Sequence, residues 1–267
     1  MAGSAGRSSI SSTNSSQRSA KDRATSAASA AGVRSFYGRR QGHRLRPAQQ
    51  ALLDEWLPRL GIDIAEAVPA SCNPRTLFAP PLPTVWLEVG YGGGEHLAAQ
   101  ALAHPTTGLI GCEPYVNGVA SLLRQVAEGG QRNIRTFGDD ARLLIDVLAD
   151  ASVDRVFLLF PDPWPKVRHH KRRFIQPGNL DALARILADD AEFLFATDHM
   201  GYARWALAHL TVHPAFEWLV EAPSDWREPP VGWQATRYEA KSAAQGLPRA
   251  YLRFRRIPRG RGIGPGS

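Results

Sequence analysis

Short β-branched or aromatic runs alternate with helical patterns over residues 84–210. The strand-like runs cover 84–89, 109–113, 133–137, 155–160 and 192–197, and the helical patterns cover 95–103, 116–127, 141–148, 180–188 and 202–210. This alternation predicts βαβ units and a parallel sheet. Two later runs, 216–220 and 251–255, have no full helical pattern between them and predict an antiparallel hairpin. We expect an α/β, Rossmann-like fold, with a seven-stranded, mostly parallel sheet and helices on both faces.

The composition predicts a single domain between two tails. Residues 1–32 are rich in Ser, Ala and Gly with scattered Arg, which is typical of a disordered basic tail. Residues 33–257 are expected to form the domain, with an amphipathic helix at 47–60 in its N-terminal extension. Residues 258–267 are expected to be a flexible tail.

Basic charge is confined to three segments, although the net charge of the chain is only +7. Residues 1–46 contribute +8, residues 166–173 contribute +5 and residues 249–261 contribute +6, so the remainder carries −12. Confined basic charge on an acidic body indicates a phosphate-rich partner such as a nucleic acid. For the tail alone, solvated charge is the simpler interpretation.

Other features exclude several classes of protein. No apolar run approaches the roughly 18 residues that cross a bilayer, so no membrane association is expected. The two cysteines, Cys72 and Cys112, make no disulfide framework and no zinc spacing. We therefore expect a cytoplasmic protein without a metal.

A glycine-rich loop follows the first predicted strand and opens the first helix. It reads Glu88-Val89-Gly90-Tyr91-Gly92-Gly93-Gly94, and Gly90 and Gly92 would let the backbone approach a ligand. Glu113 ends the next strand, where an acid can bind a ribose diol. Together these residues predict a nucleoside cofactor site.

The acids favour S-adenosylmethionine over a nicotinamide dinucleotide. The dinucleotide fingerprint needs a third glycine where this chain has Glu95, and a carboxylate would repel a pyrophosphate. Glu88 suits the cationic amino acid part of S-adenosylmethionine. Asp140, after the third strand, is placed to meet the adenine amino group, although a helix N-cap explains it equally well.

The stretch 160–173, Phe-Pro-Asp-Pro-Trp-Pro-Lys-Val-Arg-His-His-Lys-Arg-Arg, holds one acid, Asp162, in a proline frame at the end of the fourth strand. A dense basic patch follows it, which suggests chemistry on a polyanion. Trp164 is interpreted as either a core residue or a base-stacking residue. His169 and His170 lack a third ligand and are not expected to bind metal. The expected phosphate contacts are Arg168, Lys171, Arg172 and Arg173.

With these motifs the chain closely resembles the bacterial tRNA (guanine-N7-)-methyltransferase family over residues 34–256. The resemblance is carried by the segments 34–36, 88–94, 111–113, 138–141, 160–166, 196–198 and 236–239. It implies a class I methyltransferase fold with an RNA-binding N-terminal extension. The implied reaction is methylation of tRNA at guanine N7, with the variable-loop guanine at tRNA position 46 as the target.

The resemblance also implies roles for individual residues. Asp162 would be the catalytic acid and would also bind the cofactor, together with Glu88, Gly90, Gly92, Glu113 and Asp140. The target nucleotide would contact Lys166, Asp198, Thr236, Arg237, Tyr238 and Glu239. The family usually has Thr-Lys-Phe-Glu in the last segment, so the contact at Arg237 is the least certain of these. A monomer or weak homodimer is expected.

Three other functions compete with this interpretation. A nicotinamide oxidoreductase is disfavoured by Glu95 and the basic patch. An RNA-binding module with a decayed methyltransferase fold is disfavoured because the acids Glu88, Glu113, Asp140 and Asp162 are all present. A methyltransferase for proteins or small molecules would have little use for three arginine-rich segments.

Overall fold

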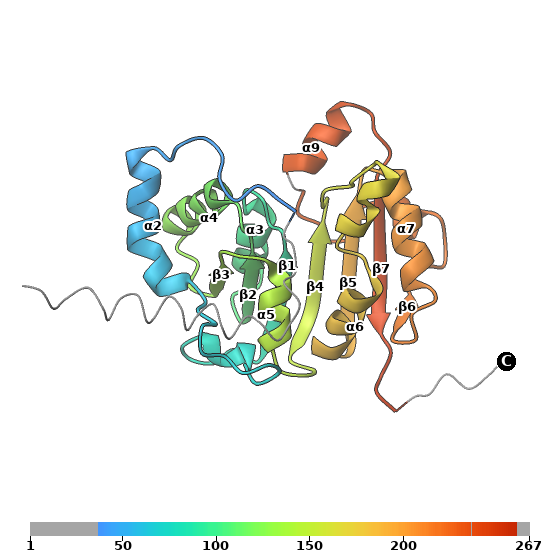
Figure 1. The fold of residues 1–267 in the computed structure, drawn as a ribbon, viewed down its shortest axis with the longest axis horizontal. Helices are drawn as coiled ribbons and strands as arrows, with labels where there is room; N and C mark the ends of the chain where they lie inside the picture. The colour runs from blue at the N-terminus through green and yellow to red at the C-terminus, as the bar shows by residue number, and fades with distance from the viewer. Residues whose placement is uncertain (1–36, 236, 261–267) are drawn as a thin grey trace, which may run out of the picture. The chain divides into compact units, whose positions relative to one another are not determined.

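A computed structural model describes residues 37–235 and 237–260, without the side chains of Arg237, Tyr238, Ala240 and Lys241. One seven-stranded sheet runs through them in the order β3-β2-β1-β4-β5-β7-β6 (Figure 1). The strands are β1 (Thr84–Val89), β2 (Thr107–Cys112), β3 (Ile134–Phe137), β4 (Val153–Leu159), β5 (Leu187–Thr197), β6 (Phe216–Trp218) and β7 (Ala250–Arg256). Strands β1 to β5 are parallel, and β7 is antiparallel to both of its neighbours. The predicted fold class is confirmed.

Helices cover both faces of this sheet. The helices are α2 (Pro47–Leu60), α3 (Glu95–Ala103), α4 (Val116–Gly129), α5 (Ala141–Val147), α6 (Pro177–Ile186), α7 (Met200–Leu210), α8 (Ser224–Arg227) and α9 (Arg237–Ala244), with 3-10 turns η1 (Pro74–Leu77) and η2 (Val167–Arg172). Residues of α2, α3 and α4 pack in one apolar cluster, and residues of α5, α6 and α7 pack in another. The two clusters lie on opposite faces because neighbouring strand residues alternate between them: Trp86 belongs to the first and Leu87 to the second.

The order of the strands creates a switch point between β1 and β4. From β1 the chain moves outward through β2 to β3 and then returns to the other side of β1 as β4. Ligands of open α/β sheets bind beyond the carboxyl ends of the strands at such a point. We call this edge of the sheet, where β1 to β5 end, the carboxyl edge, and the other end the opposite edge.

One expectation about the sheet is wrong. The two late strands were expected without a full helix between them, whereas α8 and α9 both lie there. The stretch 221–235 is rich in Pro, Gly and charged residues, so it carries no helical periodicity. The spacing Thr236-x-x-Glu239 is that of a capping box and was the available signal for α9.

The predicted helix at 47–60 is confirmed as α2. The predicted tails 1–32 and 258–267 fall mainly outside the described residues, so the domain boundaries stay a prediction. Within the described residues, no helix has the length and apolar character that crossing a bilayer requires.

Candidate functional site

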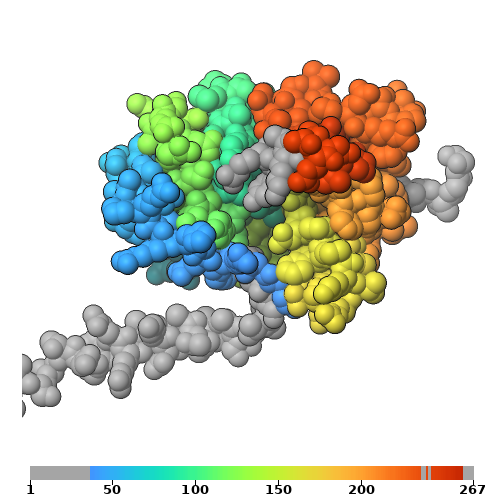
Figure 2. Space-filling model, turned by 90° about the horizontal axis from the view of Figure 1, so that it is seen from above, coloured from blue at the N-terminus to red at the C-terminus, as the bar shows by residue number. Residues whose placement is uncertain are grey.

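The four acids predicted to line the site all lie at or after the ends of strands that meet at the carboxyl edge, which Figure 2 views from above. Glu88 lies in β1, Glu113 after β2, Asp140 at the start of α5 and Asp162 after β4. The negative charges of Asp162 and Glu88 both act on Glu113, so the sheet brings these three carboxyls together. The acids Glu88, Glu113 and Asp140 are each at most 8% exposed.

The glycine loop turns in a conformation that suits glycine. Gly90 and Gly92 have φ angles of +74° and +57°, in the left-handed region that L side chains rarely adopt. A Cβ added at Gly90 would meet no atom within 4 Å, so there is open space beside the backbone at this turn. A ligand can therefore approach the main chain closely here.

Glu113 braces this loop. Its carboxylate accepts the backbone N–H of Gly92 at 2.8 Å and that of Tyr115 at 2.9 Å. Burial raises the pKa of Glu113, the two N–H donors oppose this effect, and the nearby Asp162 and Glu88 add to it. The site thus concentrates negative charge, which favours a cationic ligand over a phosphate.

Glu88 has a partner that the sequence analysis missed. The Nδ1 atom of His96 lies 2.8 Å from Glu88 Oε2, and both side chains are almost fully buried. His96 is in the first turn of α3, which begins directly after the glycine loop. The spacing of His96 and Gln100, one helical turn apart on α3, was the signal for this cluster.

Asp140 acts as the N-cap of α5 in the structure. Its side chain accepts the backbone N–H of Arg142 at 3.0 Å, and the Arg142 guanidinium binds both of its oxygens. The N-cap interpretation is therefore confirmed. A contact between Asp140 and adenine stays a prediction.

Asp162 is exposed between two strained residues. Phe160 and Trp164 have φ angles of +48° and +42°, which is unusual for bulky aromatic side chains. Non-glycine residues in this region cost about 1–3 kcal/mol each and cluster at functional sites. The surrounding structure therefore holds the Asp162 loop in one defined conformation.

Arg173 supplies part of that support, and its predicted role as a phosphate contact stays a prediction that its position does not favour. It is only 3% exposed, its Nε donates to the carbonyl of Pro163 at 2.9 Å, and its guanidinium lies over the rings of Tyr202 and Trp205. In this position the guanidinium anchors the proline frame of Asp162.

The rest of the stretch 166–173, which we call the basic run, forms η2 on the surface. Lys166, Arg168 and Lys171 are exposed. The Arg172 guanidinium lies 4.8 Å from the centre of the Trp164 ring, so this tryptophan packs within the motif, while a base-stacking role stays a prediction. Loss of water contacts and the charges of Arg172 and Arg168 lower the pKa of His169. Protonation of His169 is therefore disfavoured beside these cations.

The residues predicted to contact the target nucleotide lie in three elements. Lys166 precedes η2, and Asp198 is half-buried just after β5. Glu239, in the first turn of α9, is 6% exposed and accepts hydrogen bonds from Trp233 and Tyr251. These bonds anchor α9. Thr236 and the side chains of Arg237 and Tyr238 lie outside what the structure describes.

A stretch of the N-terminal extension, residues 38–46, also lies at the carboxyl edge. Arg40 forms an ion pair with Asp139 at 2.7 Å, and its carbonyl accepts the N–H of Val116 at 3.1 Å. Asn117 binds the backbone of Gly42 and His43. Basic residues of the extension thus lie on the same edge as the basic run (Figure 2).

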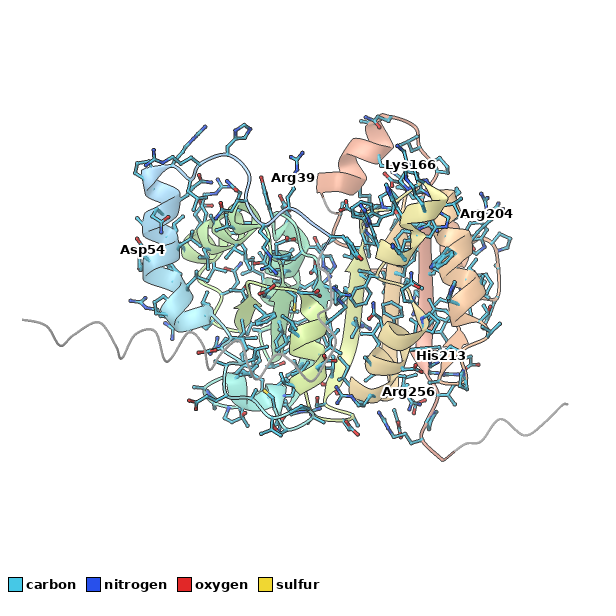
Figure 3. All side chains as sticks on the ribbon, in the orientation of Figure 1. Arg39, Asp54, Lys166, Arg204, His213 and Arg256 are labelled. Carbon is cyan, nitrogen blue, oxygen red and sulfur yellow. The ribbon has the colours of Figure 1, made fainter. Side chains whose placement is uncertain are left out.

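The arginines of β7 are engaged within the fold. Arg255 pairs with Glu217, and Arg253 pairs with Glu192. Arg256 lies at the opposite edge in Figure 3. Among the described residues, no group of three or more His, Cys, Asp or Glu is arranged to hold a metal ion.

The comparisons with known proteins agree with this architecture. Residues 83–251 match the family described as a putative methyltransferase. The tRNA (guanine-N(7)-)-methyltransferase of Rhodospirillum rubrum is 52% identical over 225 residues, which is 84% of this chain and 88% of that protein. The enzyme of the same name from Nitrobacter winogradskyi is 50% identical over 83% of this chain and 86% of its own length. That of Chelativorans sp. is 46% identical over 83% of this chain and 95% of its own.

Among solved structures, the 16S rRNA methyltransferase KamB matches with a TM-score of 0.49 and 15% identity, over 72% of this chain and all of that one. The three enzymes named above are far more similar to this chain in sequence. Because they cover more than four fifths of the chain at about half identity, the chain belongs to the tRNA (guanine-N(7)-)-methyltransferase family.

Proposed function

We propose that this protein transfers a methyl group from S-adenosylmethionine to N7 of a guanine in tRNA, the variable-loop guanine at position 46. One observation carries the proposal: the glycine loop, the buried acids beside it and the exposed Asp162, held between strained residues and followed by the basic run, meet at one switch point. The relatives carry the name of this activity.

The residues fit the cofactor. S-adenosylmethionine combines an adenosine with a cationic amino acid part and has no phosphate. The open space beside Gly90 leaves room for a ligand next to the backbone. The carboxylates Glu88 and Glu113 complement a cation and would repel a pyrophosphate. We assign cofactor binding to Glu88, Gly90, Gly92, Glu113 and Asp140.

When bound, S-adenosylmethionine supplies a methyl group on a sulfonium that leaves as a neutral thioether. Guanine N7 has a free lone pair and attacks without losing a proton, so no residue needs to act as a general base. The protein must hold N7 in line with the methyl group, and such positioning can lower the barrier by ~7–11 kcal/mol.

Asp162 is our candidate for the catalytic residue. A methylated guanine ring is cationic, and a carboxylate beside it stabilises the charge that develops in the transition state. Asp162 can also accept hydrogen bonds from the N1–H and N2 amino groups of guanine. The strained flanking residues keep this carboxylate in place and limit its reorganisation during the reaction.

We assign target binding to Lys166, Asp198 and the segment from Thr236 to Tyr238, with Glu239 anchoring α9. Phosphate binding is assigned to Arg168, Lys171 and Arg172. We further propose a cytoplasmic protein that acts as a monomer or weak homodimer.

The test is a methyl-transfer assay on bulk tRNA with labelled S-adenosylmethionine, followed by nucleoside analysis. We expect 7-methylguanosine as the product. A transcript with adenine in place of guanine 46 is the control and should take up no label. Label in any other nucleoside, or undiminished label in the control transcript, would overturn the proposal.

A further inference from the structure

His96 and Glu88 form a buried pair that the reaction outlined above does not use. The His96 side chain is 1% exposed and that of Glu88 is 3% exposed, with 2.8 Å between His96 Nδ1 and Glu88 Oε2. A buried carboxylate without a partner is costly, so this hydrogen bond stabilises the Glu88 side chain in its buried position. Among the described residues, no donor to the other oxygen, Oε1, is recorded.

The second ring nitrogen determines where the proton of His96 lies. Gln100 presents its amide nitrogen 3.2 Å from His96 Nε2. An amide nitrogen only donates, so Nε2 accepts and the proton of a neutral ring is on Nδ1. Gln100 therefore orients His96 as a donor to Glu88.

Two aromatic rings keep the imidazole in place. Phe157, the partner of Glu88 in the pairing of β1 with β4, meets the His96 ring edge-on at 4.9 Å. Trp233 lies 5.6 Å from the same ring and donates to Glu239 at the start of α9. The ring is thus packed from the strand side and from the α9 side.

We propose that His96 is a positioning residue for the cofactor: it holds Oε2 of Glu88, so that Oε1 remains to accept a hydrogen bond from the ammonium of the cofactor's amino acid part. This inference rests on the proposed cofactor. Without the donor, the Glu88 side chain can rotate, and the ammonium then loses its hydrogen-bond acceptor. The adenosine part of the cofactor makes no use of this pair.

Calorimetry with two probes separates these parts of the ligand. S-adenosylhomocysteine carries the amino acid group, whereas 5′-methylthioadenosine has the same adenosine and sulfur without it. In His96→Leu, we expect the Kd of S-adenosylhomocysteine to rise by about tenfold or more, since a hydrogen bond to a charged group is lost. The Kd of 5′-methylthioadenosine should change less than about twofold.

The matched variant is His96→Asn, whose amide nitrogen can take the position of Nδ1 and should restore much of the lost affinity. If His96→Leu does not unfold cooperatively on heating, His96→Gln replaces it, because the longer amide does not retain the Nδ1 donor. Equal weakening of both probes, or an Asn variant as weak as the Leu variant, overturns the role of His96. Wild-type protein that binds neither probe would instead contradict the proposed cofactor.

Discussion

Two arginine-rich regions lie in different parts of the fold. One is the basic run 166–173, and the other consists of the arginines in β7 and in the residues that follow β7. Figure 3 shows Lys166 at the carboxyl edge, beside α9, and Arg256 at the opposite edge. In the basic run, Lys166, Arg168 and Lys171 are exposed, and no ion pair with an acid is recorded for them among the described residues. In the second region, each of three arginines forms an ion pair with an acid: Arg253 with Glu192, Arg255 with Glu217 and Arg259 with Asp189.

The difference teaches that charge density along a chain does not measure the charge available to a partner. Arg256 and Arg259 also donate to the backbone carbonyl of Ala184 at the end of α6, so they hold the sheet edge together. These two guanidinium groups are therefore occupied by contacts within the protein. The charge of the basic run is left for a polyanion such as tRNA.

The largest expected effect tests whether chemistry is confined to the carboxyl edge. Asp162→Asn should lower the rate of methyl transfer by about 10²–10³-fold, as the loss of one preorganised charge-stabilising group does. Binding of S-adenosylhomocysteine, measured by calorimetry, should change little. Asp190→Asn is the control, because it removes an exposed acid at the start of β5, at the other edge. A wild-type rate in Asp162→Asn would remove this residue from the mechanism.

The second prediction compares the two basic regions directly. Changing Lys166, Arg168 and Lys171 together to Gln should weaken tRNA binding and flatten the slope of log Kd against log salt by roughly two to three units. The matched control changes Arg253, Arg255 and Arg259 to Gln. The slope for this control, measured by filter binding at several salt concentrations, should equal that of the wild-type protein. If the control flattens the slope as much as the first variant, the two regions do not differ in the way proposed.

The third prediction concerns the cost of burying the Glu113 carboxylate at the carboxyl edge. Burial raises the pKa of Glu113 above its ordinary value of 4.5, so the folded protein holds this proton more tightly than the unfolded chain. The contribution of Glu113 to stability is therefore present below pH 4.5 and declines as the pH rises through the raised pKa. Relative to Glu113→Gln, the wild-type protein should lose thermal stability over this window. If the Tm of the wild-type protein instead rises relative to that of Glu113→Gln as the pH increases, the raised pKa is contradicted.

The smallest effect is expected at the ion pairs of β5 and β7. Glu192 binds Arg155 at 3.0 Å and Arg253 at 2.7 Å. Glu192→Gln should lower the free energy of unfolding in urea by about 1 kcal/mol, because these pairs are partly exposed. Affinity for tRNA should stay the same. A marked gain in tRNA affinity would mean that the released arginines can reach RNA. The two regions would then differ only in whether acids pair with their arginines, and not in their access to RNA.

Much of the fold could be predicted from the sequence. The bounds of β1 and α3 are those predicted, because an apolar run and a helical pattern with a glycine loop between them leave little choice locally. Helix α9 was missed, since it follows a Pro- and Gly-rich stretch and its apolar periodicity is short. Predicted strand ends differ by a few residues, as for β5, which begins at Leu187 directly after α6.

The site was predicted in its motifs and less well in its contacts. The sequence placed Glu88, Glu113 and Asp162 at strand ends, and the parallel sheet brings strand ends together. It did not indicate that His96 binds Glu88 or that Arg173 is buried over Tyr202 and Trp205. These contacts depend on where helix faces and loops pack against the sheet.

The sequence by itself determined the alternation of strands and helices, the glycine loop and the acids that follow the strands, because each depends on residues close together in the chain. Only the tertiary structure decided which charges are available. Arg253 meets an acid 61 residues away, and Arg259 meets one 70 residues away. Such pairs form when β7 inserts antiparallel beside β5, and no local pattern along the chain records that neighbour.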